Sequence, residues 1–186
     1  MRKNSYIKMI INGENDEVIY IGSNFKLFPQ LEQTETHPFT IGSWSNNSTN
    51  IDNFDGYIDN LNIINGEALY WDNYTINKSR ILNNTTFNGI IETTNYKFES
   101  NNNNYFIIPE NVAPQLSNID FTIEFWAKLT NINASYSCIY HQGSWTENGK
   151  MLTIYQYQDK LYLDFYGAYV AINITEYYDI WTHFAI

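Results

Sequence analysis

The strongest constraint on how this chain folds is the alternation of residues 121–129, FTIEFWAKL. Every odd-numbered position is apolar, whereas the even-numbered positions carry Thr122, Glu124, Trp126 and Lys128. A period of two predicts a β-strand with one face towards a hydrophobic core, because successive side chains of a strand point to opposite faces. No stretch of the chain shows a convincing helical period of 3.6, so little helix is expected.

The composition supports the same fold class. Aromatic residues make up 17% of the 186 residues and hydrophobic residues 44%, which is enough for a core although only 16% are charged. The apolar set is dominated by Tyr, Phe, Ile, Thr and Trp, the residues that favour strands. We therefore predict an all-β chain of one domain or two small ones, with no apolar run long enough for a transmembrane helix.

The charge and the cysteine content argue against several kinds of binding partner and against an internal cross-link. A formal net charge of −10 argues against nucleic acid and anionic membrane surfaces as partners, because the chain could not neutralise phosphates. The single cysteine, Cys138, excludes an internal disulfide bond. The first residues, MRKNSYIKMIING, alternate in polarity, so no signal peptide is predicted.

One strand is expected to contain a β-bulge. In residues 54–64 the alternation runs through Ile58 and resumes at Leu61 and Ile63, one position out of phase. A slip of one residue moves side chains to the opposite face, so the extra residue is predicted at Asp59–Asn60. An Asn-Gly turn at 65–66 ends this strand.

The remaining strands follow the same pattern. They are separated by turn residues at Asn12–Gly13, Asn148–Gly149 and Gln158–Asp159, while residues 71–86 lack periodicity and are interpreted as a linker. Strands are predicted at 6–11, 18–21, 39–44, 54–64, 96–99, 105–108, 120–129, 137–140, 151–156, 160–165, 169–174 and 180–186.

Three segments resemble laminin-G-like domains of the concanavalin-A-like lectin and glucanase superfamily, in the variant found in viral and phage surface proteins. They are the bulged strand 54–63 with the NGEALY that follows, FTIEFW at 121–126, and WTHFA at 181–185. The resemblance implies an antiparallel two-sheet jelly-roll sandwich.

The order of these segments is permuted relative to that family. Residues 1–70 resemble the C-terminal half of such a domain and residues 87–186 the N-terminal half, with 71–86 between them. The chain is either one circularly permuted domain or a window from a tandem array. We favour one sandwich, because two half-sandwiches would each expose a sheet face and a long edge. The strand that ends at Ile186 should then pair antiparallel with the one that begins near Tyr6.

Asp59 is the main candidate metal ligand. The resemblance implies a structural Ca²⁺ bound by an acidic residue in this strand, and Ca²⁺ takes several carboxylate and carbonyl oxygens. Asp55 and Asp52 are close in the sequence, and residues 99–101 could add further oxygens. The alternative is a solvated aspartate at the bulge.

Aromatic residues on polar strand faces are the candidate ligand-binding residues. Trp126 shares a face with Glu124, and Tyr162 and Tyr166 share one with Asp164. Sugar rings stack on such aromatic side chains while nearby carboxylates bind their hydroxyl groups. The alternative is that these aromatic residues simply face the surface or pack under a loop.

Residues 141–145, HQGSW, are predicted to form a loop at the rim of the binding site, with Trp145 as a further ligand-binding candidate. Catalysis is not predicted, although glucanases share the superfamily. A retaining glycosidase needs two carboxylates about 5–5.5 Å apart, and the glucanase pattern Glu-x-Asp-x-x-Glu is missing. Glu124 has no carboxylate two residues before or after it, and no serine nucleophile motif occurs.

These observations predict a non-catalytic glycan-binding or adhesion module of a surface or virion protein, with a glycan or a cell-surface receptor as its partner. The resemblance places it on a virion surface or outside the cell. The alternative is a structural β-sandwich that serves as a spacer or contacts neighbouring subunits in an array. The third interpretation is that the protein is a relative of the glycoside hydrolases.

Overall fold

The chain is all-β, as predicted. The computed structural model describes residues 2–3, 6–20, 39–46, 49–66, 68, 96–99, 105–108, 116, 119–132, 136–143, 151–165 and 168–186. In these ranges the chain forms strands β1 to β15, and its one described helical element is a single 3₁₀ turn, η3 (Thr175–Tyr177). No helix within the described ranges is long and apolar enough to cross a membrane.

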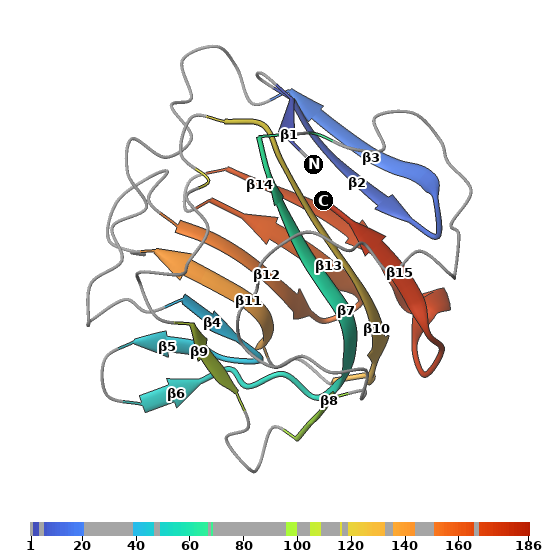
Figure 1. Ribbon diagram of the computed structural model, residues 1–186. Helices are drawn as coiled ribbons and strands as arrows, with labels where there is room; N and C mark the ends of the chain where they lie inside the picture. The colour runs from blue at the N-terminus through green and yellow to red at the C-terminus, as the bar shows by residue number, and fades with distance from the viewer. Residues whose placement is uncertain are drawn as a thin grey trace.

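Seven of the described strands form one antiparallel sheet, called sheet A (Figure 1). Its order is β1 (Arg2–Lys3), β2 (Tyr6–Ile11), β15 (Thr182–Ala185), β10 (Phe121–Leu129), β7 (Gly56–Asn65) and β8 (Tyr96–Phe98), and β3 (Glu14–Tyr20) also pairs with β2. Strands from both ends of the chain are therefore neighbours within one sheet.

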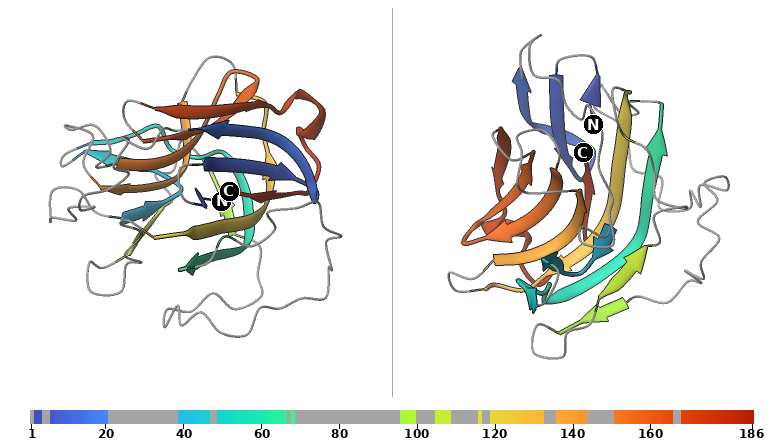
Figure 2. Two further views of the ribbon diagram at one scale, coloured as in Figure 1. Left: turned by 90° about the horizontal axis from the view of Figure 1, so that it is seen from above. Right: turned by 90° about the vertical axis from the view of Figure 1, so that its left-hand side faces the viewer.

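Six described strands form a second antiparallel sheet, called sheet B. Its order is β14 (Tyr169–Asn173), β13 (Lys160–Asp164), β12 (Met151–Tyr157), β11 (Tyr136–Gly143), β4 (Phe39–Ile41) and β9 (Phe106–Ile108). β5 (Trp44–Asn46) and β6 (Thr49–Ile51) form a separate two-stranded sheet, and β5 contacts β11 and β4 of sheet B. In the right-hand view of Figure 2, the orange strands of sheet B lie opposite β10 and β7 of sheet A.

A hydrophobic core fills the space between the two sheets. The apolar face of β10 is fully buried, and the rings of Phe125 and Phe184 stack with their centroids 5.5 Å apart. The same cluster contains Ile154 and Leu163 from sheet B, together with Ile58 from β7. Burying each such side chain stabilises the fold by about 1.5–3 kcal/mol, so residues from both chain segments stabilise one core.

The ends of the described chain are joined by strand pairing. β15 pairs antiparallel with β2, with Phe184 opposite Ile11 and Ala185 opposite Ile10, which confirms the pairing expected between these two segments. The hairpin after β2 turns at Asn12–Gly13, where φ is 49° and 84°. Positive φ at both central residues is the property that makes Asn-Gly a favoured hairpin turn.

The predicted bulge in β7 is confirmed. Between the pairs Glu124–Asn62 and Trp126–Asp59, two residues of β7 stand opposite one residue of β10. Asn60, the exposed residue of the bulge, has a φ of 48°. The bulge therefore places Asp59 beside Trp126 on the face of sheet A that points away from the core, called its outer face.

Several strand boundaries in the structure differ from the predicted ones. The stretch predicted as one strand at 39–44 is interrupted at Gly42, whose φ of 87° is not a strand conformation, and β5 begins at Trp44. The second strand of the first hairpin starts at Glu14, earlier than the predicted 18, because the tight turn lets pairing resume at once. The interpreted linker at 71–86 and the turn at 148–149 lie outside the described residues.

Candidate functional site

The outer face of sheet B carries a row of tyrosines from four neighbouring strands. Alternation places them opposite the buried leucines and isoleucines of the same strands. The tyrosine row consists of Tyr136 on β11, Tyr155 and Tyr157 on β12, Tyr162 on β13 and Tyr169 on β14.

Strand register brings these tyrosines together. Tyr136 lies directly opposite Tyr157, and Tyr155 lies directly opposite Tyr162. The turn between β12 and β13 is fixed by Gln158, which has a φ of 51°. Residues directly opposite one another across antiparallel strands have Cβ atoms about 4.5–5.5 Å apart, so their side chains interact.

The central rings stand on edge and face one another. The ring centroids of Tyr155 and Tyr162 are 4.9 Å apart with an angle of 4° between the planes, and those of Tyr136 and Tyr157 are 4.3 Å apart with an angle of 15°. Parallel rings lying flat and side by side could not approach so closely without overlapping. The faces of these rings are therefore used in contacts within the row.

Tyr169 differs from the central tyrosines. It lies on β14, at the edge of sheet B, and is 61% exposed. Its ring is tilted by 52° relative to Tyr162 at a centroid distance of 5.7 Å. No other ring contact is recorded for Tyr169 among the described residues, so this end of the row offers an aromatic face to a ligand.

A carboxylate lies beside the exposed ring. Asp164 on β13 is the direct cross-strand partner of Tyr169. The hydroxyl of Tyr155 donates a long hydrogen bond of 3.5 Å to Asp164 Oδ2. Burial, and then the charge of Asp164, raise the pKa of Tyr155 well above the usual tyrosine range. An exposed ring, a carboxylate and a fixed hydroxyl thus lie within one small area.

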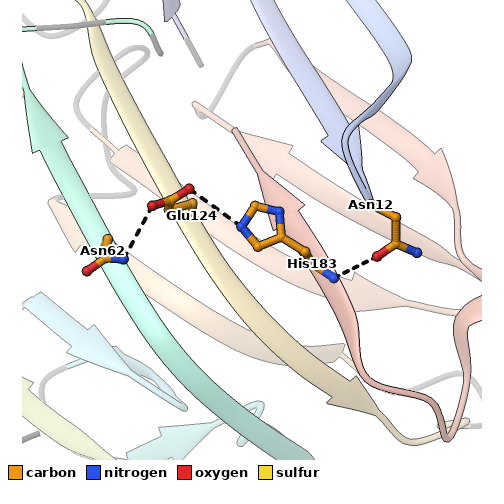
Figure 3. A network of polar contacts seen from close by, with 4 residues as sticks. All are labelled: Asn12, Asn62, Glu124 and His183. Atoms are coloured by element: carbon orange, nitrogen blue, oxygen red, sulfur yellow. Dashed lines mark hydrogen bonds and ion pairs between the residues drawn. The ribbon is translucent and has the colours of Figure 1, made fainter. Parts of the chain in front are cut away.

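The outer face of sheet A contains the other pair expected to bind ligand, but Glu124 is only 5% exposed there. Its Oε1 accepts a hydrogen bond of 3.3 Å from Asn62 Nδ2, and its Oε2 lies 3.5 Å from His183 Nε2 (Figure 3). The backbone N–H of His183 in turn donates to Asn12 Oδ1 at 3.0 Å. The carboxylate of Glu124 is therefore occupied by contacts within the protein.

Trp126 and Asp59 lie next to this network, whereas Asp55 lies outside β7. Trp126 is half-buried, has the ring of His183 at 5.3 Å, and has Asp59 as its cross-strand partner. Asp55 precedes β7, and its backbone N–H donates to Ser137 Oγ at 3.2 Å. Within the described ranges no three His, Cys, Asp or Glu side chains gather as a metal-binding group. Calcium binding at Asp59 and Asp55 stays a prediction.

The predicted rim loop at 141–145 is wrong in its first three residues, which belong to β11 and pair with β12. His141 is fully buried, with Nδ1 2.8 Å from Thr153 Oγ1 and its ring packed against Trp44. A register shift between positions 138 and 140 of β11 interrupts the alternation that would have revealed this longer strand. Trp145 and Tyr166 lie outside the described residues.

Sequence reasoning identified only Tyr162 of the tyrosine row, together with Asp164 on its face. A signal for two others was present, because Tyr155 and Tyr157 alternate with glutamines in YQYQ. Tyr136 and Tyr169 could not be found in the same way. Their membership depends on which residues oppose one another across strands, and single-strand periodicity does not contain that information.

Comparison with known proteins gives no match: no family model, no curated protein and no solved structure corresponds to this chain. The functional argument therefore depends on the geometry of the site.

Proposed function

We propose that this protein is a non-catalytic glycan-binding module and that its ligand stacks on Tyr169 beside Asp164. The observation that carries the proposal is the exposed Tyr169 ring, whose direct cross-strand partner on the neighbouring strand is Asp164. Sugars present apolar C–H faces, which pack on aromatic rings, and hydroxyl groups, which donate to carboxylates. The site supplies both kinds of contact.

The rest of the tyrosine row supports this role by holding the site rigid. Tyr162 packs against Tyr169 on one side and stacks on Tyr155 on the other, and Tyr155 bonds to Asp164. Side chains that are already ordered lose little conformational entropy when a ligand binds. A small contact area can then give useful affinity, as is typical of surface glycan sites.

The proposal assigns binding without catalysis. One carboxylate, Asp164, is assigned to the site, whereas a retaining glycosidase needs a pair about 5–5.5 Å apart. Glu124, the other carboxylate considered from the sequence, lies on the opposite sheet in contact with Asn62 and His183.

We also propose that the fold is a concanavalin-A-like jelly roll with its two halves in permuted order. The pairing of β15 with β2 supports this, because it was expected from the permuted order of the three family-like segments. Placement on a virion or cell surface follows from the same resemblance and belongs to the proposal.

Affinity electrophoresis tests the binding function. The protein is run through native gels that contain hydroxyethylcellulose, xyloglucan, galactomannan or dextran. At least one of these should retard the wild type, and Tyr169→Ala should lose that retardation. Trp181→Ala is the matched control, because Trp181 is an exposed aromatic residue, 38% exposed, that packs on Tyr57 of sheet A. Circular dichroism confirms that both variants are folded.

Two results of this experiment would count against glycan binding at Tyr169. Retardation by no glycan, or equal retardation of Tyr169→Ala and the wild type, contradicts the proposal. The structural role predicts instead that Tyr169→Ala changes self-association, which sedimentation velocity of the same variants measures.

A further inference from the structure

The tyrosine row has a second exposed ring at the end opposite Tyr169. Tyr136 on β11 is 43% exposed, whereas the tyrosines between the two ends, Tyr155, Tyr157 and Tyr162, are half-buried. Strand β11 is separated from β14 by β12 and β13. The two exposed rings therefore lie three strand spacings apart, which is about 14 Å across the sheet.

Half-buried rings connect the two ends of the row. From Tyr136 the ring centroids follow one another at 5.6, 4.9 and 5.7 Å, in the order Tyr155, Tyr162 and Tyr169. These four rings come from four neighbouring strands of sheet B. An extended ligand that lies across these strands would pass over the edges of the half-buried rings between the two exposed ones.

Each end of the row also carries a side chain that binds hydroxyl groups. Asp164 lies opposite Tyr169, and its carboxylate is an acceptor. Towards the other end, Lys160 is exposed and lies opposite Tyr157, which in turn lies opposite Tyr136. A lysine ammonium group has three donors, and a hydroxyl group both donates and accepts hydrogen bonds. Sugar hydroxyl groups can therefore be bound at both ends.

From these positions we infer that the tyrosine row binds an extended stretch of a linear glycan, with a second subsite at Tyr136 and Lys160. The inference rests on the proposed function and specifies its ligand class, which is the interior of a polysaccharide chain rather than a single terminal sugar. Two subsites on one chain bind more tightly than either alone, because the second contact is intramolecular once the first has formed. A disaccharide is too short to contact both exposed rings.

Oligosaccharides of different length test this inference. Titration calorimetry compares the disaccharide with the hexasaccharide of the cello, manno and isomalto series. In a series that the wild type binds, the hexasaccharide should bind at least about thirtyfold more tightly than the disaccharide. Tyr136→Ala should reduce this ratio by at least about fivefold, while its affinity for the disaccharide stays within about twofold of the wild type. The comparison uses the ratio in both proteins because a longer chain also offers more binding registers.

Two further variants control for other effects of the substitution. Tyr136→Phe keeps the ring that stacks on Tyr157, so it should retain most of the wild-type ratio. Trp181→Ala removes an exposed aromatic side chain from the other sheet and should leave the ratio unchanged. Circular dichroism confirms that each variant is folded.

The results separate this inference from the proposed function. A ratio that Tyr136→Ala does not change would overturn the inference, although the proposed function would then stand. So would a weaker affinity for the disaccharide with the ratio unchanged, because Tyr136 would then only support the Tyr169 site. Retardation by a polymer without binding of its hexasaccharide would overturn the inference alone. Binding of the wild type to neither the oligosaccharides nor the polymers would overturn both.

Discussion

The outer faces of the two sheets carry similar residue types but differ in what those residues contact. On sheet A, Glu124 is 5% exposed and contacts Asn62 and His183. On sheet B, Tyr169 is 61% exposed and Asp164 lies beside it. In both places a carboxylate and an aromatic residue are close neighbours, on one strand in sheet A and across two strands in sheet B. The aromatic residue is half-buried in the first place and exposed in the second.

The difference comes from what covers each face. On sheet A, Ile10 and Ala185 form a small buried cluster with Ala68 packed against it, and Lys8 is 3% exposed. Buried polar groups must be hydrogen-bonded, and Glu124 satisfies this requirement within the protein. Alternation alone therefore shows which residues share a face, whereas the cover over that face decides whether a ligand can reach them.

The largest expected effect concerns the core that both sheets share. Phe125→Ala should lower the free energy of unfolding by about 3–5 kcal/mol, because it removes a fully buried ring stacked on Phe184. Tyr169→Ala, on the exposed face, should change it by no more than about 0.5 kcal/mol. Urea denaturation measures both. Similar losses in the two variants would show that the tyrosine row supports the fold as much as the core does.

A backbone change at the start of β7 should have the next largest effect. A Cβ at Gly56 would lie 2.5 Å from the carbonyl oxygen of Lys128 and 2.8 Å from Cζ of Phe54, at a φ of 149°. Gly56→Ala should therefore cost about 2–3 kcal/mol. Gly66→Ala is the control, because Gly66 has a φ of 89° but open space around it, and about 1 kcal/mol is expected there. Equal decreases in the melting temperatures of Gly56→Ala and Gly66→Ala would contradict this account of Gly56.

The buried network on sheet A should affect stability but not binding. Glu124→Ala leaves Asn62 and His183 without their buried partner, which should cost about 1–3 kcal/mol. Glu124→Gln keeps the side-chain shape and should cost less. Retardation by a glycan should be unchanged in both variants. A loss of binding with stability intact would move the ligand site to sheet A and reverse the comparison.

The smallest effect is expected at alkaline pH. Burial, and then Asp164, raise the pKa of Tyr155 in the folded state, so the folded protein holds this proton more tightly than the unfolded chain does. Stability should therefore fall as the pH rises above about 10, the pKa of an unfolded tyrosine. The free energy of unfolding of Tyr155→Phe, measured by urea denaturation, should fall less steeply between about pH 9 and 11.

Tyr140 is a second, fully buried tyrosine with a raised pKa, and it is present in both the wild type and Tyr155→Phe. A difference between the pH dependences of the two proteins therefore reports on Tyr155. Identical slopes would mean that the Tyr155 hydroxyl is not held as described.

Much of the fold could be predicted from local patterns. The alternation of residues 121–129 identified the buried face of β10, and the slip near Asp59 located the bulge. Both are properties of one strand, and the period of two carries them directly. The pairing of β15 with β2 was expected from the order of family-like segments, with Phe184 now opposite Ile11.

The candidate site could be predicted only in part, because it depends on relations between strands. Tyr162 was named, but its neighbours Tyr155 and Tyr169 join it through cross-strand register. Glu124 was expected at the surface and is instead buried through tertiary contacts. The burial of a polar face depends on segments distant in sequence, which no local period encodes.

One binding measurement tests the central claim most directly. Wild type, Tyr169→Ala and Trp126→Ala are titrated with the same neutral polysaccharide, each variant changing one aromatic side chain on a different sheet. We predict that Tyr169→Ala weakens binding by at least about fivefold and that Trp126→Ala binds as the wild type does. Loss of binding in Trp126→Ala, with Tyr169→Ala unaffected, would contradict the assignment of the glycan site to sheet B.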